Sequence, residues 1–230
     1  MPRRRVDVSQ RVVVIGLGRF GRSVAHTLHN LGYGVTGIDI NERAVSEMAN
    51  FVSLAAQGDG SNEELLRSLQ VDRAQVGVVA QGRDLEANLL ATLSLKRIGV
   101  PWVVAKATSE LHGELLSRIG ADRIIFPERD EGLRLAHALA VPSITDYISL
   151  SPSSGVAKFP APAHFIGRTL SELHAETNAK LSVFLIKRND TIITSPSFTE
   201  RIIVGDELVV AGPDEDIEAF VEAKPAGLER

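Results

Sequence analysis

The sequence predicts an α/β protein, with a doubly wound parallel Rossmann sheet followed by a small α+β domain. Short apolar runs alternate with amphipathic helical segments through the first half of the chain. This alternation is typical of a parallel sheet that has helices on both faces. A glycine-rich turn follows the first apolar run, and the pattern changes after residue 127. These observations together predict two domains.

The first strand is expected at Val12–Ile15, and it leads directly into the turn Gly16-Leu-Gly18-Arg-Phe-Gly21. In such a turn the first glycine permits a tight bend, the second lets the backbone approach a pyrophosphate, and the third packs the following helix closely on the strand. Asp39 ends the next apolar run, 23 residues after Gly16. That spacing is typical of an acid that holds ribose hydroxyls. The segment therefore predicts an adenine nucleotide site.

Five further strands complete the predicted sheet, with helices such as Glu86–Ile98 between them. Right-handed crossovers place these helices on both faces of the sheet. We expect the ligand beyond the carboxyl ends of the strands, where the strand order reverses. The five expected strands are Val35–Ile38, Val52–Ala55, Val76–Ala80, Trp102–Ala105 and Arg123–Phe126.

The second half of the chain begins with a predicted helix, Glu131–Ala140, and a connection at Ser149–Pro162 that is rich in serine, proline and glycine. We expect a Rossmann domain at residues 11–127, a crossover helix and hinge at 128–142, and a small α+β domain at 143–224. A core of that size is marginal, so we expect the last domain to pack against a copy of itself. Its expected elements are a short helix opening within Gly167–Leu173, strands Leu181–Lys187 and Glu207–Ala211, and a closing helix Asp214–Ala223.

Composition excludes several classes of function. The 230 residues have a formal net charge of −4, which does not favour a nucleic-acid surface. There is no cysteine, so a disulfide framework, a thiolate metal site and a cysteine nucleophile are excluded. No apolar run approaches the roughly 20 residues that span a bilayer, so we expect any membrane role to act through a partner. No nucleophile elbow, HExxH motif or paired-carboxylate arrangement appears, and we expect no enzyme activity.

Several motifs together resemble the regulatory RCK proteins of Ktr/Trk potassium uptake systems, over residues from about 11 to 223. Gly60 differs from the family pattern, which usually has alanine there, and we expect it to loosen that turn. The motifs are Gly-Leu-Gly-Arg-Phe-Gly, Asp39, Gly58-Asp59-Gly60-Ser61, Lys106-Ala107, the stretch Ile119-Gly-Ala-Asp-Arg-Ile-Ile-Phe-Pro-Glu128, and Gly205-Asp206-Glu207-Leu208.

The resemblance implies a cytoplasmic regulatory subunit at the inner face of the membrane. It implies a homodimer with a crossover helix, assembled into an octameric ring on a potassium-translocating membrane subunit. It also implies that ATP and ADP are the ligands, and that Arg19 reaches the γ-phosphate of ATP in the neighbouring subunit. Glu128 is implied to lie at the dimer interface and help hold a divalent or monovalent cation.

Arg19 also indicates a triphosphate ligand independently of the family resemblance. Backbone N–H groups and the helix dipole already serve a pyrophosphate, so an added guanidinium indicates one more negative group. The alternative is a solvent-facing arginine at a helix start. Phe20, beside it in the turn, is included among the expected nucleotide contacts. Asp39 repels a 2′-phosphate and argues against NADP, although it could instead cap the helix that begins near Asn41.

Three further positions have two interpretations each. Asp59 follows the third strand and either accepts a hydrogen bond from an adenine amino group or serves only the turn. Lys106 ends the fifth strand, where it either contacts phosphate or lies along the surface. Glu128, apart from the family resemblance, is a first-turn acid that complements a helix dipole.

Arg168 and Asn178 flank the short helix of the second domain, with Ile193 and Pro196 nearby in sequence. As in some family members, they could shape a site for cyclic di-AMP, although ordinary capping and packing explain the same residues.

Two rival functions stay open. An NAD-dependent oxidoreductase needs a proton-transfer group beside the nicotinamide, and the second domain offers no obvious one. An RCK regulator that responds to NAD or NADH is the other rival, because Asp39 suits either ribose.

Overall fold

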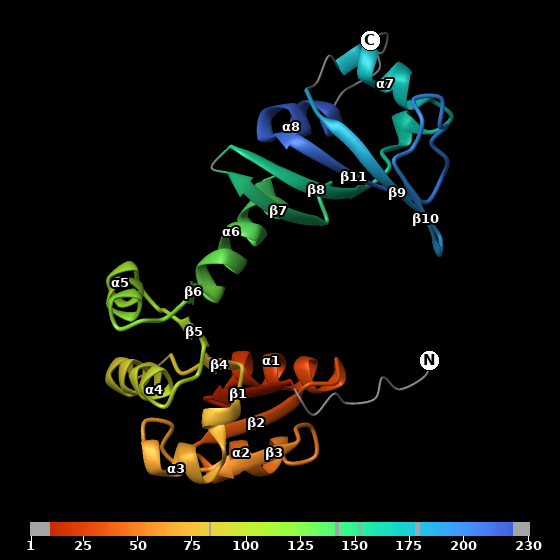
Figure 1. Cartoon of the computed structure of the whole chain (residues 1–230). Coiled ribbons are helices and arrows are strands. Elements are labelled where there is room, and N and C mark those ends of the chain that lie inside the picture. The colour runs from red at the N-terminus through yellow and green to blue at the C-terminus, as the bar shows by residue number, and fades with distance from the viewer. Residues whose placement is uncertain (1–9, 83, 141–142, 152, 178–179, 223–230) are drawn as a thin grey trace. The chain divides into compact units, whose positions relative to one another are not determined.

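The structure, a computed structural model, describes residues 10–82, 84–140, 143–151, 153–177 and 180–222. The chain divides into two compact units, residues 1–128 and 129–230. Figure 1 shows a helix-covered sheet in the first unit and a second sheet with its own helices in the other.

The first unit is a six-stranded parallel sheet in the order β3-β2-β1-β4-β5-β6. The chain order reverses between β1 and β4, which confirms the doubly wound prediction. The strands are β1 (Arg11–Ile15), β2 (Gly34–Asp39), β3 (Leu54–Gln57), β4 (Val76–Val79), β5 (Trp102–Lys106) and β6 (Arg123–Ile125). The helices are α1 (Arg19–Asn30), α2 (Glu42–Met48), α3 (Glu63–Ser68), α4 (Leu85–Arg97) and α5 (Glu110–Arg118), with a 3₁₀ turn, η1 (Val71–Arg73).

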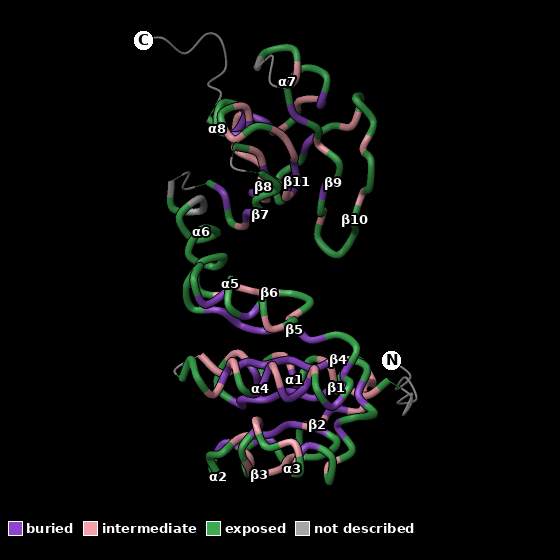
Figure 2. Tube along the Cα trace, turned by 60° about the vertical axis from the view of Figure 1, so that its left-hand side comes forward, coloured by how far each residue is buried: buried purple, intermediate pink, exposed green. Residues whose placement is uncertain are grey.

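Burial on both faces explains the continuous apolar run of β1. Val13 and Ile15 belong to one core cluster, whereas Val12 and Val14 belong to another. Alternate side chains of a strand point to opposite faces, so each face of this sheet has its own apolar layer. Figure 2 shows the buried residues concentrated along the central strands.

The third strand begins two residues later than predicted. Val52 is buried in a core cluster, but it precedes the ladder, which starts at Leu54. The apolar character of Val52 therefore reports packing and not strand pairing.

The second unit contains a five-stranded antiparallel sheet in the order β10-β9-β11-β8-β7. Helix α6 (Pro127–Ala140) crosses the boundary between the units and begins four residues before the predicted Glu131, because proline suits the first turn of a helix. The other elements are β7 (Asp146–Ser151), β8 (Ser154–Pro160), η2 (Ala163–Phe165), α7 (Leu170–Thr177), β9 (Ser182–Arg188), β10 (Thr191–Thr194), β11 (Asp206–Pro213) and α8 (Asp214–Glu222).

The predicted connection at Ser149–Pro162 is wrong. Most of it forms the β7–β8 hairpin, which pairs Tyr147 with Ala157. Ala157 and Phe159 are fully buried while their neighbours are only partly so, which is the alternation of a half-buried strand. The serine and glycine content concealed this alternation. β10 was also not predicted.

Candidate functional site

The glycine turn lies at the carboxyl end of β1, at the point where the strand order reverses. Gly16 has φ +93°, a conformation that glycine adopts without strain, and its N–H donates to the carbonyl oxygen of Ile38 at 2.8 Å. A Cβ at Gly21 would lie 1.8 Å from the carbonyl oxygen of Gly16, so only glycine fits there. A Cβ at Gly18 would meet nothing within 4 Å. The turn is therefore closely packed between Gly16 and Gly21, and it leaves open space beside Gly18.

Helix α1 begins at this turn without a side-chain cap. Its N-cap residue is Gly18, and its first turn has no acidic residue. The neighbouring helices α2, α3, α4 and α5 are each capped by a side chain, from Asn41, Asn62, Asp84 and Ser109. The first N–H groups of α1 and its positive dipole end are therefore available to an anion.

Asp39 fastens the glycine turn to the end of β2. Its Oδ2 accepts a hydrogen bond from the backbone N–H of Leu17 at 2.6 Å, and its Oδ1 accepts one from Asn41 at 2.8 Å. The cap of α2 is Asn41, whose side chain accepts from two backbone N–H groups, so the alternative that Asp39 caps this helix is wrong. Each carboxylate oxygen keeps a second lone pair for a ribose hydroxyl.

Arg19 is the first residue of α1 and is exposed. In the part of the chain that the structure describes, its guanidinium forms no hydrogen bond or ion pair. Arg22, one turn later, is engaged differently: its Nε donates to the carbonyl oxygen of Leu17 at 2.7 Å, and it pairs with Glu47.

Lys106 ends β5 and is 8% exposed. Its ammonium lies 2.5 Å from Oε1 of Glu128 and 5.9 Å from the ring centroid of Phe20. The hydrogen bond from this ammonium holds the pKa of Glu128 below its ordinary value. The Glu128 side chain itself is 71% exposed. Lys106 is thus a buried cation that lies against the glycine turn, and not a surface lysine.

Asp59 lies in an exposed turn after β3. Its Oδ1 accepts from the N–H of Ser61 at 2.8 Å and from the hydroxyl of the same residue at 2.7 Å. A Cβ at Gly60 would lie 2.2 Å from Cγ2 of Ile15. The missing side chain at Gly60 therefore makes room for β1, and the expected loosening of this turn stays a prediction.

Two polar residues at the crevice were not predicted. Asn88 on α4 is fully buried and donates from Nδ2 to the carbonyl oxygens of Gln81 and Lys106. Its Oδ1 and the Oε1 of Gln81 are buried without a hydrogen-bond partner in the structure. An asparagine at a core-facing position of a helix is the sequence signal that would have identified Asn88.

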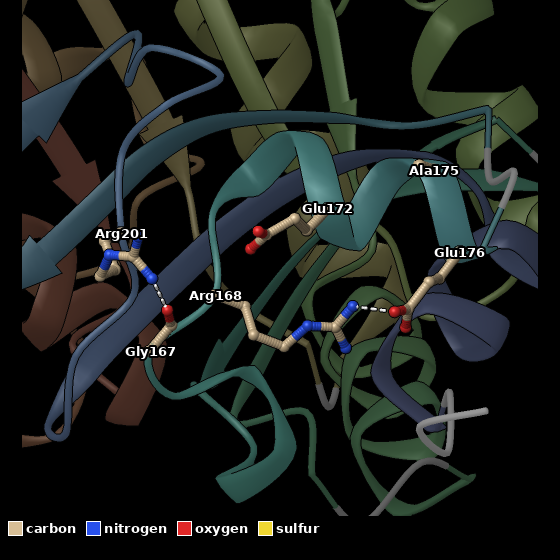
Figure 3. Close-up of a pocket in the computed structure, with 6 residues that line it drawn as sticks. All are labelled: Gly167, Arg168, Glu172, Ala175, Glu176 and Arg201. Atoms are coloured by element: carbon tan, nitrogen blue, oxygen red, sulfur yellow. Dashed lines mark hydrogen bonds and ion pairs between the residues drawn. The ribbon is translucent and has the colours of Figure 1, made fainter. Parts of the chain in front are cut away.

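The second unit contains a separate pocket of about 560 Å³ (Figure 3). Arg168 pairs with Glu176 there, and Arg201 donates to the carbonyl oxygen of Gly167. The N–H of Thr169, followed by the hydroxyl of Thr169 and the two arginines, lowers the pKa of Glu172. Asn178 lies outside the described residues. The lining residues are Gly167, Arg168, Glu172, Ala175, Glu176 and Arg201.

Two features are absent from the described part of the chain. It contains no cluster of three or more histidine, cysteine or acidic residues that could hold a metal ion. None of its helices is both long and apolar enough to cross a membrane.

Comparison with known proteins identifies both halves of the chain. Residues 12–127 match the TrkA-N domain and residues 156–224 match the TrkA-C domain. The Ktr system potassium uptake protein C of Bacillus subtilis is 37% identical over 213 residues, which cover 93% of this chain and 96% of that protein.

Two solved structures have the same fold at low sequence identity. The GsuK RCK domain has a TM-score of 0.63 at 18% identity, over 96% of this chain and 49% of that one. A GsuK channel bound to NAD has a TM-score of 0.61 at 19% identity, over 93% of this chain and 39% of that one. This chain therefore spans about half of the GsuK chains or less. The near full-length match to a Ktr protein and the match of both domains show that the chain belongs to the TrkA-N/TrkA-C family of Ktr and Trk potassium uptake proteins.

Proposed function

We propose that this protein is a nucleotide-sensing regulatory subunit that gates a potassium-translocating membrane protein, and that it distinguishes ATP from ADP at the γ-phosphate. The observation that supports this most is the unpaired guanidinium of Arg19, within the described residues, at the uncapped start of α1. The Ktr relatives that this chain matches over nearly its whole length are potassium uptake proteins and not enzymes, in agreement with the expectation from the sequence. The proposed mechanism is therefore binding without turnover.

The proposed contacts follow from the geometry of the crevice. Gly16, Gly18 and Gly21 form the turn around the shared phosphates, which the free N–H groups of α1 bind. Asp39 accepts hydrogen bonds from the ribose hydroxyls. Oδ2 of Asp59, the oxygen that the turn does not use, accepts one from the adenine amino group.

In this proposal Lys106, with the Phe20 ring 5.9 Å from its ammonium, provides a second positive charge for the phosphates. A phosphate that approaches Lys106 competes with the carboxylate of Glu128 for the same ammonium. Glu128 is the last residue of the first unit and lies in the first turn of α6. We propose that phosphate binding releases Glu128, which is then free to hold a cation together with phosphate oxygens or a partner subunit. Residues 128–142 are the proposed crossover helix and hinge.

A ligand shifts a conformational equilibrium only through its different affinity for the two states. ATP and ADP share every contact except that of the γ-phosphate. In this proposal the contact with Arg19, supplied from the neighbouring subunit, forms in one state and not in the other. The proposed assembly is a homodimer within an octameric ring, at the cytoplasmic face of the membrane.

Response to NAD or NADH is the second candidate function. A channel of the same fold has been solved with NAD bound, and Asp39 suits the ribose of either ligand. A dinucleotide offers no terminal phosphate for Arg19, so the free guanidinium favours ATP. Cyclic di-AMP at the Arg168 pocket, on the domain formed by residues 143–224, is a separate proposal for a second ligand.

Parallel calorimetric titrations of the purified full chain with ATP, ADP and NADH test the proposal. We expect both adenine mononucleotides to bind, with ATP the tighter of the two in the assembled protein. Potassium flux through reconstituted membrane partner and regulator should differ between ATP and ADP. Binding of NADH alone would replace the leading function by the second candidate, and binding of none would overturn both.

A further inference from the structure

Helix α4 has three polar side chains on its buried surface. Asn88 and Thr92 are fully buried, and Ser94 is 7% exposed. A buried polar group costs folding free energy unless it is hydrogen-bonded, so the partner of each group indicates its role. The hydroxyl of Thr92 donates to the carbonyl oxygen of Asn88 within the same helix. Asn88 and Ser94 instead donate to residues of other segments.

Asn88 joins the ends of two neighbouring strands. Its Nδ2 lies 2.6 Å from the carbonyl oxygen of Gln81, which follows β4, and 3.2 Å from that of Lys106, the last residue of β5. The side chain of Lys106 extends from that backbone to the Glu128 carboxylate. One amide group therefore fixes the backbone from which the buried ammonium projects. Its Oδ1 is buried without a partner in the described structure, so packing alone does not favour an asparagine at this position.

Ser94 holds the turn after β3, which lies at a different part of the crevice. Its hydroxyl donates to the carbonyl oxygen of Ser61 at 2.7 Å. The N–H and hydroxyl of Ser61 in turn hold Oδ1 of Asp59. This contact fixes the turn that carries Asp59 onto the side of α4. The two hydrogen-bonding side chains thus reach two different ligand contacts from one rigid helix.

We infer that Asn88 and Ser94 are separate positioning residues, Asn88 for the phosphate contact of Lys106 and Ser94 for the base contact of Asp59. The inference rests on the proposed function, because it concerns the same nucleotide crevice. Asn88 and Ser94 are not proposed to contact the nucleotide; they hold residues that do. Precise placement matters because small displacements of a charged group change its contact with a ligand substantially.

The test measures two selectivities in the full chain by calorimetry. The ratio of the AMP and ATP dissociation constants reports phosphate contacts, and the ratio for GTP and ATP reports base recognition. Asn88→Ala should lower the first ratio roughly fivefold, the factor expected when one hydrogen bond of about 1 kcal/mol is lost, and leave the second unchanged. Ser94→Ala should lower the GTP-to-ATP ratio and leave the AMP-to-ATP ratio unchanged. Ser94→Thr keeps the hydroxyl and should restore the wild-type values.

Thr92→Val is the matched control, because Thr92 is as buried as Asn88 but bonds only within α4. It should change neither ratio. If Asn88→Ala does not fold, as judged by circular dichroism, Asn88→Leu keeps the volume and lacks the donor, and the same shift is expected. Equal losses for AMP, GTP and ATP in both variants would overturn the positioning roles while leaving the proposed function intact. Failure of the wild type to bind any of the three nucleotides would overturn both.

Discussion

Arg19 of the first unit differs from Arg168 and Arg188 of the second unit in how its charge is compensated. In the first unit Arg19 has no hydrogen bond or ion pair within the described ranges, although it begins a helix beside the crevice. In the second unit Arg168 pairs with Glu176, and Arg188 binds the buried carboxylate of Asp206 through two bonds of 2.9 Å. An arginine that is already compensated stabilises its own fold. One that is not compensated has its charge available for a ligand.

Breaking the Arg188–Asp206 pair should have the largest effect, and it acts on the stability of the second unit. The Asp206 side chain is fully buried, and its removal leaves Arg188 without its main partner. Loss of one member of a buried ion pair costs about 3 to 5 kcal/mol. Asp206→Ala should therefore lower the free energy of unfolding of the second unit by about 3 kcal/mol, measured by scanning calorimetry, with ADP affinity unchanged. An unaltered unfolding transition would show that the pair contributes nothing net.

The same pair predicts a dependence on pH. Burial alone would raise the pKa of the Asp206 carboxyl, but hydrogen bonds from Arg188 and from the N–H of Ile203 hold it below its ordinary value. A pKa that is lower in the folded state gives stability that is complete above the unfolded value of about 4 and is lost as the pH falls through the folded value. Asp206→Asn should abolish this loss in acid denaturation curves. A curve parallel to that of the wild type would contradict the assignment.

Asp39 provides the largest expected effect on ligand binding. A hydrogen bond to a charged group contributes roughly 1.5 to 3 kcal/mol, so Asp39→Ala should weaken ATP and ADP together by on the order of tenfold or more. The two should fall together because both present the same ribose hydroxyls. Calorimetric titration measures the losses. Asp39→Asn keeps the shape of the side chain and should be intermediate, whereas unchanged binding by a folded Asp39→Ala variant would contradict the ribose contact.

Replacement of Arg19 tests most directly whether an arginine without a partner serves a ligand and not the fold. Arg19→Ala should reduce ATP affinity much more than ADP affinity, because a charge-assisted contact is lost only from the triphosphate. The dissociation constant of ADP divided by that of ATP should fall by about tenfold. The melting temperature should not change, because the side chain has no partner in the described structure. The variant should also no longer stimulate potassium flux when ATP replaces ADP.

Arg22→Ala is the matched control on the same helix. Arg22 is held by Leu17 and Glu47, so its removal should lower stability and leave the ATP-to-ADP ratio unchanged. Equal losses of ATP and ADP affinity in Arg19→Ala would mean that Arg19 contacts only the shared phosphates. The proposal that the protein distinguishes ATP from ADP at the γ-phosphate would then be wrong.

The central strand of the first unit was predictable because it is buried on both faces. The run Val12–Ile15 is apolar throughout, and glycine marks where it ends. The hairpin β7–β8 was not predictable in the same way. Only alternate residues of β8 and only Tyr147 of β7 are buried, and serines lie among the remaining positions of both strands. A half-buried strand of small polar residues has the composition of a linker, and only its tertiary packing distinguishes the two.

The same reasoning applies to the candidate site. Glycine spacing and the position of Asp39 predicted the turn, because backbone geometry restricts those residue types. The pairing of Lys106 with Glu128 and the contacts of Asn88 with the backbone of Lys106 join residues 18 to 22 positions apart. No local pattern encodes such pairs, since they depend on which strands become neighbours. The roles of the site residues and the domain boundaries stay predictions.

The smallest expected effect concerns the pocket of the second unit, and it would sharpen the comparison. If Glu176 already compensates Arg168, then Glu176→Gln should free that guanidinium for an anionic ligand. Exposed ion pairs contribute about 0.2 to 1 kcal/mol, so the affinity of the full chain for cyclic di-AMP should rise by no more than about fivefold. Glu218→Gln on α8 removes the same charge from an exposed position and serves as the control. Equal gains in both variants would mean that only net charge matters, and Arg168 would then have no place in a ligand site.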